Sequence, residues 1–243
     1  MKIDLDAIEE TAKLLYIRAL KVLPDDIKEG FQRLDASETD ATGQSILATM
    51  IQNITVAEDT DNLLCQDTGI PIYNITIGRS VEVDGIDLKT AIRKGCTRAT
   101  QEYPLRSSVV HPVTRENEHT SCGRRVPVIN VDFSEADEEL VIEMIPKGSG
   151  SENGSFLKMC IPADGVAGGK TFVIDKGLEA GGKVCPPTIV GVGVGGTADL
   201  CTKLAKIAAT RRLGSVCDDA EGAKLEAELS GAVNSLGIGP QGL

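Results

Sequence analysis

The sequence predicts an α+β fold, a single mixed domain with helical N- and C-terminal parts around a central β-sheet. Apolar residues near both ends of the chain recur at steps of three and four, the period of amphipathic helices. Residues 109–145 are instead rich in valine and isoleucine with period-two stretches, as in half-buried strands. No internal repeat or low-complexity linker divides the 243 residues, so we expect one domain over residues 1–243.

The first helix is expected in residues 4–23, because the helical spacing of apolar residues there ends before a proline. A second helix should follow that proline. Residues 42–57 predict a third helix with Thr42 as its N-cap. In residues 63–75, apolar residues flank a polar turn, and we expect a strand, a loop and a second strand.

The β-rich segment 109–145 provides most of the expected sheet. Residues 147–154 are rich in glycine and serine and predict a loop. Residues 188–194 predict a buried strand, whose glycines allow another segment to approach closely. The remaining helices are expected in residues 87–103, 164–182, 198–213 and 219–236.

Composition excludes several classes of protein. The formal net charge is −11 and the pI is near 4.7, so the chain repels phosphate backbones, and no stripe of Lys and Arg with interleaved aromatics offsets this. We expect no nucleic-acid partner. No apolar run approaches the ~20 residues that a membrane span needs, and the start of the chain does not resemble a signal peptide. We therefore expect no membrane association and a cytoplasmic location.

Seven cysteines form an odd set without tight spacing, which argues against a disulfide framework and for reduced thiols. No pair makes a Cys-x-x-Cys motif, so a zinc knuckle has no support. Any metal site must be gathered from distant segments. The cysteines are Cys65, Cys96, Cys122, Cys160, Cys185, Cys201 and Cys217.

Two cysteine motifs are candidates for chemistry. In the first, Cys65 stands two residues before the carboxylate of Asp67 in a predicted turn; the alternative is a buried free cysteine followed by an Asx-type turn with Gly69 at positive φ. In the second, Cys185 is followed by two prolines that stiffen the backbone as a rigid ligand loop would need. Its alternative is a loop that the prolines simply end.

Two further features could bind an anion. The glycines and serines of residues 147–154 expose backbone N–H groups that can surround an anion, although the segment is not a Walker A loop and a flexible turn is the alternative. Arg106 follows a proline and a leucine, and its planar guanidinium matches a carboxylate bidentately. The alternative for Arg106 is a solvated surface side chain.

Together these segments resemble the α subunit of the class I fumarase and tartrate dehydratase family over essentially the whole chain. The motifs that carry the resemblance are Cys65-Gln66-Asp67-Thr68-Gly69, Pro104-Leu105-Arg106, residues 147–153, Cys185-Pro186-Pro187 with Gly195-Gly196-Thr197, and residues 236–243. The resemblance implies a [4Fe-4S] cluster held by three cysteines, with one open iron that acts as a Lewis acid on the substrate.

The resemblance also implies roles for individual residues. Cys65 and Cys185 match two of the cluster ligands. The family's third cysteine follows the closing Gly-Pro-Gln-Gly-Leu motif, so we expect it beyond Leu243 and expect the chain to be truncated there. Cys160 and Cys217 are the alternatives within the chain, although no motif supports either of them.

Asp67 matches the family's acid, which protonates the departing hydroxyl. Gln66 matches a substrate-contacting position, and Arg106 and the Gly148 loop match positions that grip substrate carboxylates. The base belongs to the family's β subunit. The resemblance therefore implies a chain that is active only with that partner, in an α2β2 hetero-oligomer or with an α dimer.

The substrate expected from the sequence is fumarate or malate, as in the tricarboxylic acid cycle, because residues 150–153 follow the fumarase form of their loop. One alternative is L-tartrate or another small dicarboxylate. A second alternative, from another class, is a non-catalytic metal-binding or scaffold protein that keeps the family motifs.

Overall fold

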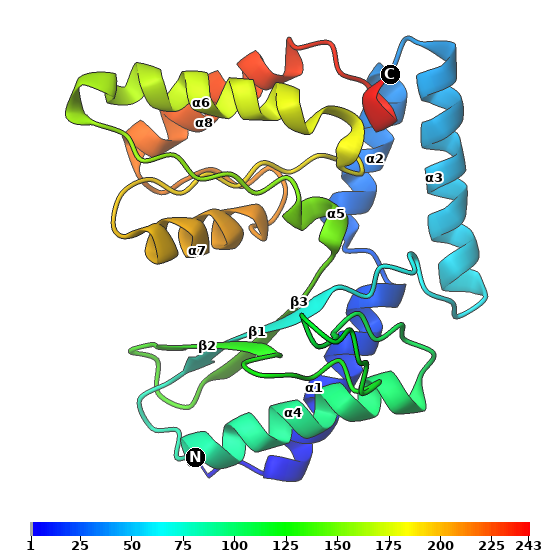
Figure 1. Cartoon of the computed structure of the whole chain (residues 1–243), viewed down its shortest axis with the longest axis vertical. Coiled ribbons are helices and arrows are strands. Elements are labelled where there is room, and N and C mark those ends of the chain that lie inside the picture. Colours follow the sequence, from blue (N-terminus) through cyan, green and yellow to red (C-terminus); the bar gives the residue numbers. More distant parts are fainter. Residues whose placement is uncertain (1) are drawn as a thin grey trace. The chain divides into compact units, whose positions relative to one another are not determined.

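The computed structural model describes residues 2–243 and divides into two compact units (Figure 1). Met1–Leu23 and Asn53–Ser149 form the first unit, and Pro24–Gln52 and Gly150–Leu243 form the second. Helices and a three-stranded sheet occur together in the chain, so the expected mixed class is confirmed.

The expected helices are all present, whereas the described chain forms fewer strands than expected. The α-helices are α1 (Leu5–Lys21), α2 (Asp25–Ser37), α3 (Ala41–Asp59), α4 (Gly85–Glu102), α5 (Ser149–Glu152), α6 (Gly165–Ala180), α7 (Ala198–Ala209) and α8 (Ala220–Asn234). The strands are β1 (Ile70–Ile77), β2 (Val128–Phe133) and β3 (Leu140–Lys147). Short 3-10 turns cover Pro162–Asp164, Gly181–Lys183 and Pro240–Gly242. In the described chain, no helix has both the length and the apolarity that crossing a membrane requires.

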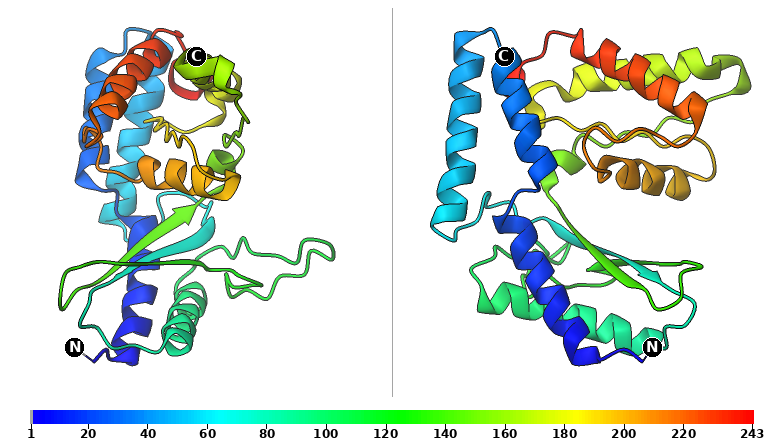
Figure 2. Two further views of the ribbon diagram at one scale, coloured as in Figure 1. Left: turned by 90° about the vertical axis from the view of Figure 1, so that its left-hand side faces the viewer. Right: turned by 180° about the vertical axis from the view of Figure 1, so that it is seen from behind.

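The sheet of the first unit has the order β2-β1-β3, with β1 parallel to β2 and antiparallel to β3. Tyr73 and Ile75 of β1 are two residues apart, share one face of the sheet and are fully buried there. Helices α1 and α4 cover this face (Figure 2). The Tyr73 hydroxyl donates to the carbonyl of Ala12 at 3.0 Å, which ties the central strand to α1.

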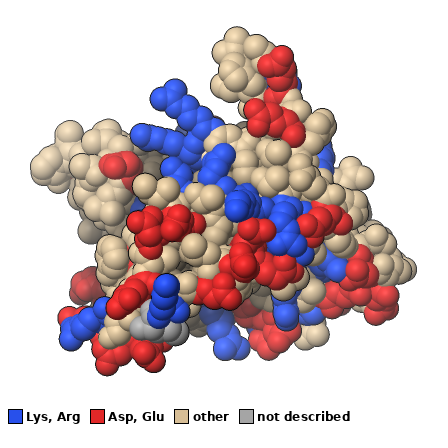
Figure 3. Space-filling view, turned by 90° about the horizontal axis from the view of Figure 1, so that it is seen from below, with Lys and Arg blue, Asp and Glu red and all other residues tan. Residues whose placement is uncertain are grey.

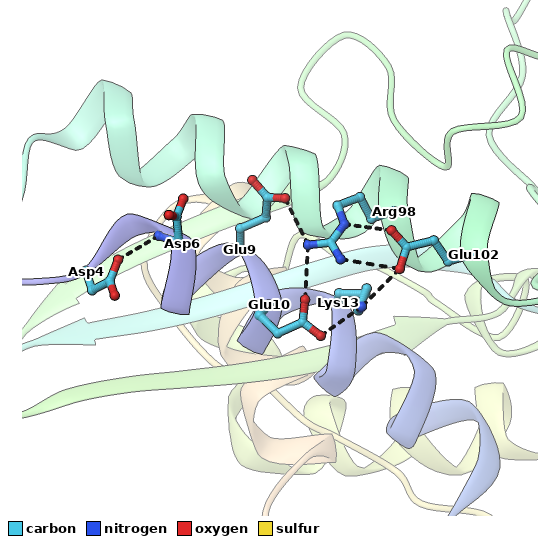
Figure 4. A network of polar contacts seen from close by, with 7 residues as sticks. All are labelled: Asp4, Asp6, Glu9, Glu10, Lys13, Arg98 and Glu102. Carbon is cyan, nitrogen blue, oxygen red and sulfur yellow. Dashed lines mark hydrogen bonds and ion pairs between the residues drawn. The ribbon is translucent and has the colours of Figure 1, made fainter.

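Helices α1 and α4 approach each other closely at Gly95. A Cβ atom at this position would lie 2.3 Å from the carbonyl oxygen of Glu9, so only glycine permits the observed spacing. On the solvent side of this contact, Arg98 binds carboxylates of both helices (Figure 4). Basic and acidic side chains are interspersed on the face seen in Figure 3, on which α1 and α4 lie.

The charge network between these helices shifts the pKa of its members. Hydrogen bonds from Arg98, and then from Lys13, lower the pKa of Glu102 from its ordinary 4.5 to about 2. The same carboxylate, followed by that of Glu9, raises the pKa of Arg98. Glu102 is exposed and Arg98 is half-exposed, so the network acts as a solvated cluster of several charges rather than as a buried ion pair.

The second unit buries few large side chains. Among its described residues, the buried hydrophobic side chains are Phe31, Leu47 and Leu229. Residues 188–194 run along α7, where a Cβ at Gly191 would lie 2.0 Å from the carbonyl oxygen of Ala205 and one at Gly193 would lie 2.1 Å from that of Cys201. The expected close approach at these glycines is confirmed.

Two expectations about the first third of the chain were wrong. The N-cap of α3 is Asp40 and not Thr42, because Oδ1 of Asp40 accepts from the backbone N–H groups of Thr42 and Gly43, each at 2.9 Å. Residues 63–69 form no strand. There, Leu64 donates to the carbonyl of Leu20 at 2.9 Å, so its backbone bonds to the end of α1 and not to a neighbouring strand.

Three further segments differ from expectation. In residues 109–127 the ladder pairing is limited to one bridge, between Gly123 and Val126, because several residues there have positive φ and interrupt an extended chain. The loop in residues 147–154 contains the single turn of α5. Residues 188–194 form no strand and are exposed or half-exposed rather than buried, since they pack on α7 instead of joining a sheet.

Candidate active site

The Cys65 motif forms a tight turn just before β1. Within it, the backbone N–H of Asp67 lies 3.4 Å from the sulfur of Cys65, and the N–H of Thr68 donates to the carbonyl of Gln66 at 3.0 Å. Gly69 has a φ of +69°, as the Asx-turn alternative expected. Cys65 is exposed rather than buried, so the structure does not support the buried-cysteine part of that alternative.

The carboxylate of Asp67 is held by the loop that begins at Gly148. Its Oδ2 atom accepts from the backbone N–H of Ser149 at 2.9 Å and from the Ser149 hydroxyl at 3.2 Å. A Cβ at Gly148 would lie 2.8 Å from the same oxygen, so the loop can contact the carboxylate closely only with glycine there. The second oxygen, Oδ1, takes part in neither hydrogen bond and remains for other chemistry.

The strand pairing explains why these two distant segments meet. Ile70, the first residue of β1, is paired with Lys147, the last residue of β3. The turn before β1 therefore lies beside the loop after β3. Gly69 fits directly against this loop, since a Cβ on Gly69 would lie 2.5 Å from the carbonyl oxygen of Lys147.

Thr68 is the other unusual residue of the turn. It is fully buried, and its hydroxyl has no hydrogen-bond partner in the part of the chain that the structure describes. A buried hydroxyl without a partner costs free energy. Such a group beside Asp67 is a candidate contact for a bound ligand or water.

The other residues expected to bind substrate also lie in the first unit. Gln66 and Arg106 are exposed, and Arg106 follows the buried Leu105 in the segment after α4. Among the predicted residues, the structure brings Asp67 and Gly148 into contact. The substrate roles of Gln66 and Arg106 stay predictions.

Cys185 lies in the second unit, two residues after the 3-10 turn Gly181–Lys183. This turn packs on the closing motif, because a Cβ at Gly182 would lie 2.3 Å from the carbonyl oxygen of Gln241. The peptide bond between Pro186 and Pro187 is cis. The Cys185 motif and the closing motif of residues 236–243 are thus neighbours within this unit.

The donor chemistry of the two cysteines fits an iron–sulfur cluster. Cys65 and Cys185 are both exposed free thiols, and thiolates are the usual ligands of such clusters. The expected third ligand beyond Leu243 lies outside the described residues. Within residues 2–243, no group of three or more His, Cys, Asp and Glu side chains is arranged to hold a metal ion. Joint ligation by Cys65 and Cys185, which belong to different units, stays a prediction.

Sequence reasoning missed Ser149 as a functional residue. The loop that contains it was singled out, but its contact with Asp67 spans 82 residues of sequence. Only the pairing of β1 with β3 brings the two together. The pattern of the loop alone indicates anion binding by backbone N–H groups, and in the structure the N–H of Ser149 binds the chain's own carboxylate.

Comparisons with known proteins agree over nearly the whole chain. The family described as "Fumarate hydratase (Fumerase)" matches residues 9–243. The chain is 44% identical, over 238 residues, to the Methanocaldococcus jannaschii protein named "Putative L(+)-tartrate dehydratase subunit alpha", which covers 97% of this chain and 84% of that protein. It is 30% identical, over 221 residues, to the Escherichia coli K12 protein named "L(+)-tartrate dehydratase subunit alpha", covering 91% of this chain and 73% of the relative.

Proposed function

Since the chain belongs to the class I fumarate hydratase and tartrate dehydratase family of hydro-lyase α subunits, we propose that it forms part of an L(+)-tartrate dehydratase. The names of the relatives support the tartrate alternative better than the fumarate expectation drawn from residues 150–153. Both substrates are small dicarboxylates that carry, or gain, a hydroxyl group next to a carboxylate.

The observation that carries this proposal is the held carboxyl of Asp67. Its Oδ2 atom is occupied by the two donors of Ser149, at 2.9 and 3.2 Å. The free Oδ1 atom is thus the one that carries a proton toward the departing hydroxyl of the substrate. In this role Asp67 is the acid of the elimination. The partner subunit supplies the base that removes a proton from the neighbouring carbon of the substrate.

The rest of the site binds and orients the diacid. Arg106 receives one substrate carboxylate through its forked N–H groups, and Gln66 donates a further hydrogen bond beside Asp67. Gly148 keeps the loop close enough for Ser149 to fix the acid. The loop thus acts on the substrate mainly through the position it gives to Asp67.

Cys65 and Cys185 are the proposed ligands of a [4Fe-4S] cluster. When bound, such a cluster supplies an open iron that acts as a Lewis acid on the substrate hydroxyl and carboxylate. The names of the relatives specify an α subunit, so a β subunit is the expected partner, in an α2β2 assembly. The cytoplasmic location expected from the sequence is part of the same proposal.

Fumarate and malate remain the second candidate substrates. The family that matches residues 9–243 is described as fumarate hydratase, and residues 150–153 follow the fumarase form of the loop. In both reactions Asp67 acts as the acid and Arg106 binds a carboxylate of the substrate. Direct competition between the two substrates therefore decides between them.

The test uses the chain reconstituted anaerobically with iron, sulfide and its β subunit. We expect turnover of L(+)-tartrate at a higher kcat/KM than that of malate, and no turnover by either subunit alone. Asp67→Asn should keep the iron–sulfur absorbance and the partner but lose turnover, because an amide cannot donate that proton. Asp132→Asn, an exposed change on β2, is the matched control.

Cys65→Ser should lose most bound iron, because a hydroxyl is a poor ligand for this cluster, whereas Cys160→Ser should keep it. A malate preference would select the second candidate. Full turnover by Asp67→Asn would refute the proposed acid. A reconstituted wild-type complex without visible iron–sulfur absorbance would instead favour a non-catalytic protein.

A further inference from the structure

A pair of thiols lies in the first unit, apart from the site described above. Cys96 of α4 is fully buried, and Cys122, in the segment between α4 and β2, is 9% exposed. The sulfur of Cys122 lies 3.6 Å from the carbonyl oxygen of Arg93 and 3.4 Å from the hydroxyl oxygen of Thr97. The sulfur of Cys96 lies 3.7 Å from the carbonyl oxygen of Ser121. Both sulfurs therefore lie against the same turn of α4.

The two thiols differ in acidity. A hydrogen bond with Cys96 lowers the pKa of Cys122 to about 6, helped by Thr97 and by the positive charge of Arg93. The same hydrogen bond, together with burial, raises the pKa of Cys96. Cys122 is thus the more acidic thiol of the pair, and the thiolate is the form that attacks an oxidant.

Solvent has access to only one of the two thiols. An open cleft of about 370 Å³ lies along α4, and its lining includes Arg93 and Thr97, the two residues that contact the Cys122 sulfur. Cys96 instead belongs to the buried core that also contains Tyr16 and Tyr73. Cys122, which is 9% exposed and touches two residues of the cleft, is therefore the more accessible thiol, while Cys96 is shielded from solvent.

The segment that presents Cys122 is held in an unusual conformation. Ser121, directly before it, is fully buried and has a φ of +52°, which is costly for a residue other than glycine. The guanidinium of Arg93 donates to the carbonyl oxygens of Gly123 at 3.0 Å and Val126 at 2.6 Å. These contacts fix the backbone on both sides of Cys122 and hold its sulfur beside α4.

We propose that Cys122 and Cys96 are a reactive thiol pair that hydrogen peroxide converts into a disulfide. The Cys122 thiolate attacks one oxygen of the peroxide, the O–O bond breaks, and the other oxygen leaves as hydroxide and becomes water. The resulting sulfenic acid is then attacked by the sulfur of Cys96, which loses its proton as the S–S bond forms and a second water leaves. Two thiols are oxidised by two electrons, and one peroxide is reduced to two waters.

This reaction is independent of the proposed hydro-lyase activity. Its product links α4 covalently to the segment before β2. A dithiol reductant reverses it, as expected for a disulfide.

The test is a peptide map of the reduced 243-residue chain after one equivalent of hydrogen peroxide. Free thiols are blocked with N-ethylmaleimide in denaturant, so that buried thiols also react, and the chain is then digested with trypsin. We expect residues 95–98 linked to residues 116–124 as the main cysteine product, with two of the seven thiols lost and both recovered by dithiothreitol. This measurement needs no variant and does not depend on activity.

Variants then assign the order of attack. Cys96→Ala should leave Cys122 as a sulfenic acid that dimedone traps, whereas Cys122→Ala should leave Cys96 as a free thiol. Cys160→Ser, which changes an exposed cysteine outside the pair, should give the wild-type product. The proposal is overturned if peroxide modifies other cysteines while residues 95–98 and 116–124 stay unlinked, or if Cys96→Ala gives no trapped Cys122.

Discussion

The position of the Asp67 carboxylate depends on Ser149, which gives it two donors through its backbone and its hydroxyl. We expect Ser149→Ala to lower kcat by about tenfold with little change in KM, because a charge-assisted hydrogen bond contributes about 1.5–3 kcal/mol and the backbone donor remains. Steady-state assays of the reconstituted enzyme measure this. Ser155→Ala, which alters another serine near the loop, should have no such effect; equal losses in both variants would remove the assigned role from Ser149.

Thr68 offers a test of a different kind. Because its buried hydroxyl has no partner among the described residues, Thr68→Val should keep or raise the free energy of unfolding, by up to about 1 kcal/mol. Urea unfolding of the two proteins measures this. A loss of more than about 1 kcal/mol would show that the hydroxyl is satisfied in solution. A stable variant with reduced activity would instead assign the hydroxyl to substrate or water.

At the site, the sequence predicted the residues with reactive groups but not those that hold them. Asp67 and Gly148 were expected from their motifs, and the structure places them in contact. Ser149 was not expected, because its role arises from a strand pairing that links Ile70 with Lys147. A local pattern carries no signal for such a partner.

The close crossing of α1 and α4 rests on Gly95. Gly95→Ala should lower the free energy of unfolding by about 2 kcal/mol, because the new methyl group would lie 2.3 Å from the carbonyl oxygen of Glu9 and force the helices apart. Gly85→Ala, in the same helix, meets no atom within 4 Å and should be neutral or slightly stabilising. Urea unfolding of both variants measures the difference. An unchanged free energy of unfolding for Gly95→Ala would mean that the two helices separate easily.

Helices were predicted well because their apolar spacing is a local property, and α1, α4, α6, α7 and α8 all lie within expected segments or one to two residues from them. Strands were predicted less well, because an apolar extended segment becomes a strand only where a partner is available. Around Leu64 the partners are helical: Leu64 donates to Leu20, and Asn53 donates to Leu64 at 3.0 Å. At Gly193 the carbonyl accepts from the thiol of Cys201 at 3.1 Å, within a contact with α7.

Across the whole molecule, the network around Arg98 predicts a dependence of stability on pH. The pKa of Glu102 is lowered to about 2 from 4.5 by Arg98 and then Lys13. A lowered pKa stabilises the fold above pH 4.5, and this contribution is lost as the pH falls toward 2. The urea concentration at the midpoint of unfolding should therefore be constant above about pH 5 and decrease at lower pH.

The variant Arg98→Met isolates the part of this dependence that comes from the network. It should lower the midpoint at neutral pH and make the fall at acidic pH shallower, because Glu102 then loses the hydrogen bond that contributes most to its shift. Arg33→Met, which removes the exposed ion pair with Glu29, is the matched control. If the urea midpoint depends on pH in the same way for wild type and Arg98→Met, the network does not determine the loss of stability at acidic pH.

The pairing of Ile70 with Lys147 has a consequence for how the chain acquires its activity. Helices such as α1 form from neighbouring residues and fold early, whereas an antiparallel contact between strands far apart in sequence is slow to close. Until that contact has closed, Asp67 has no Ser149 to hold it. During refolding, recovery of catalysis should therefore lag behind recovery of helical structure.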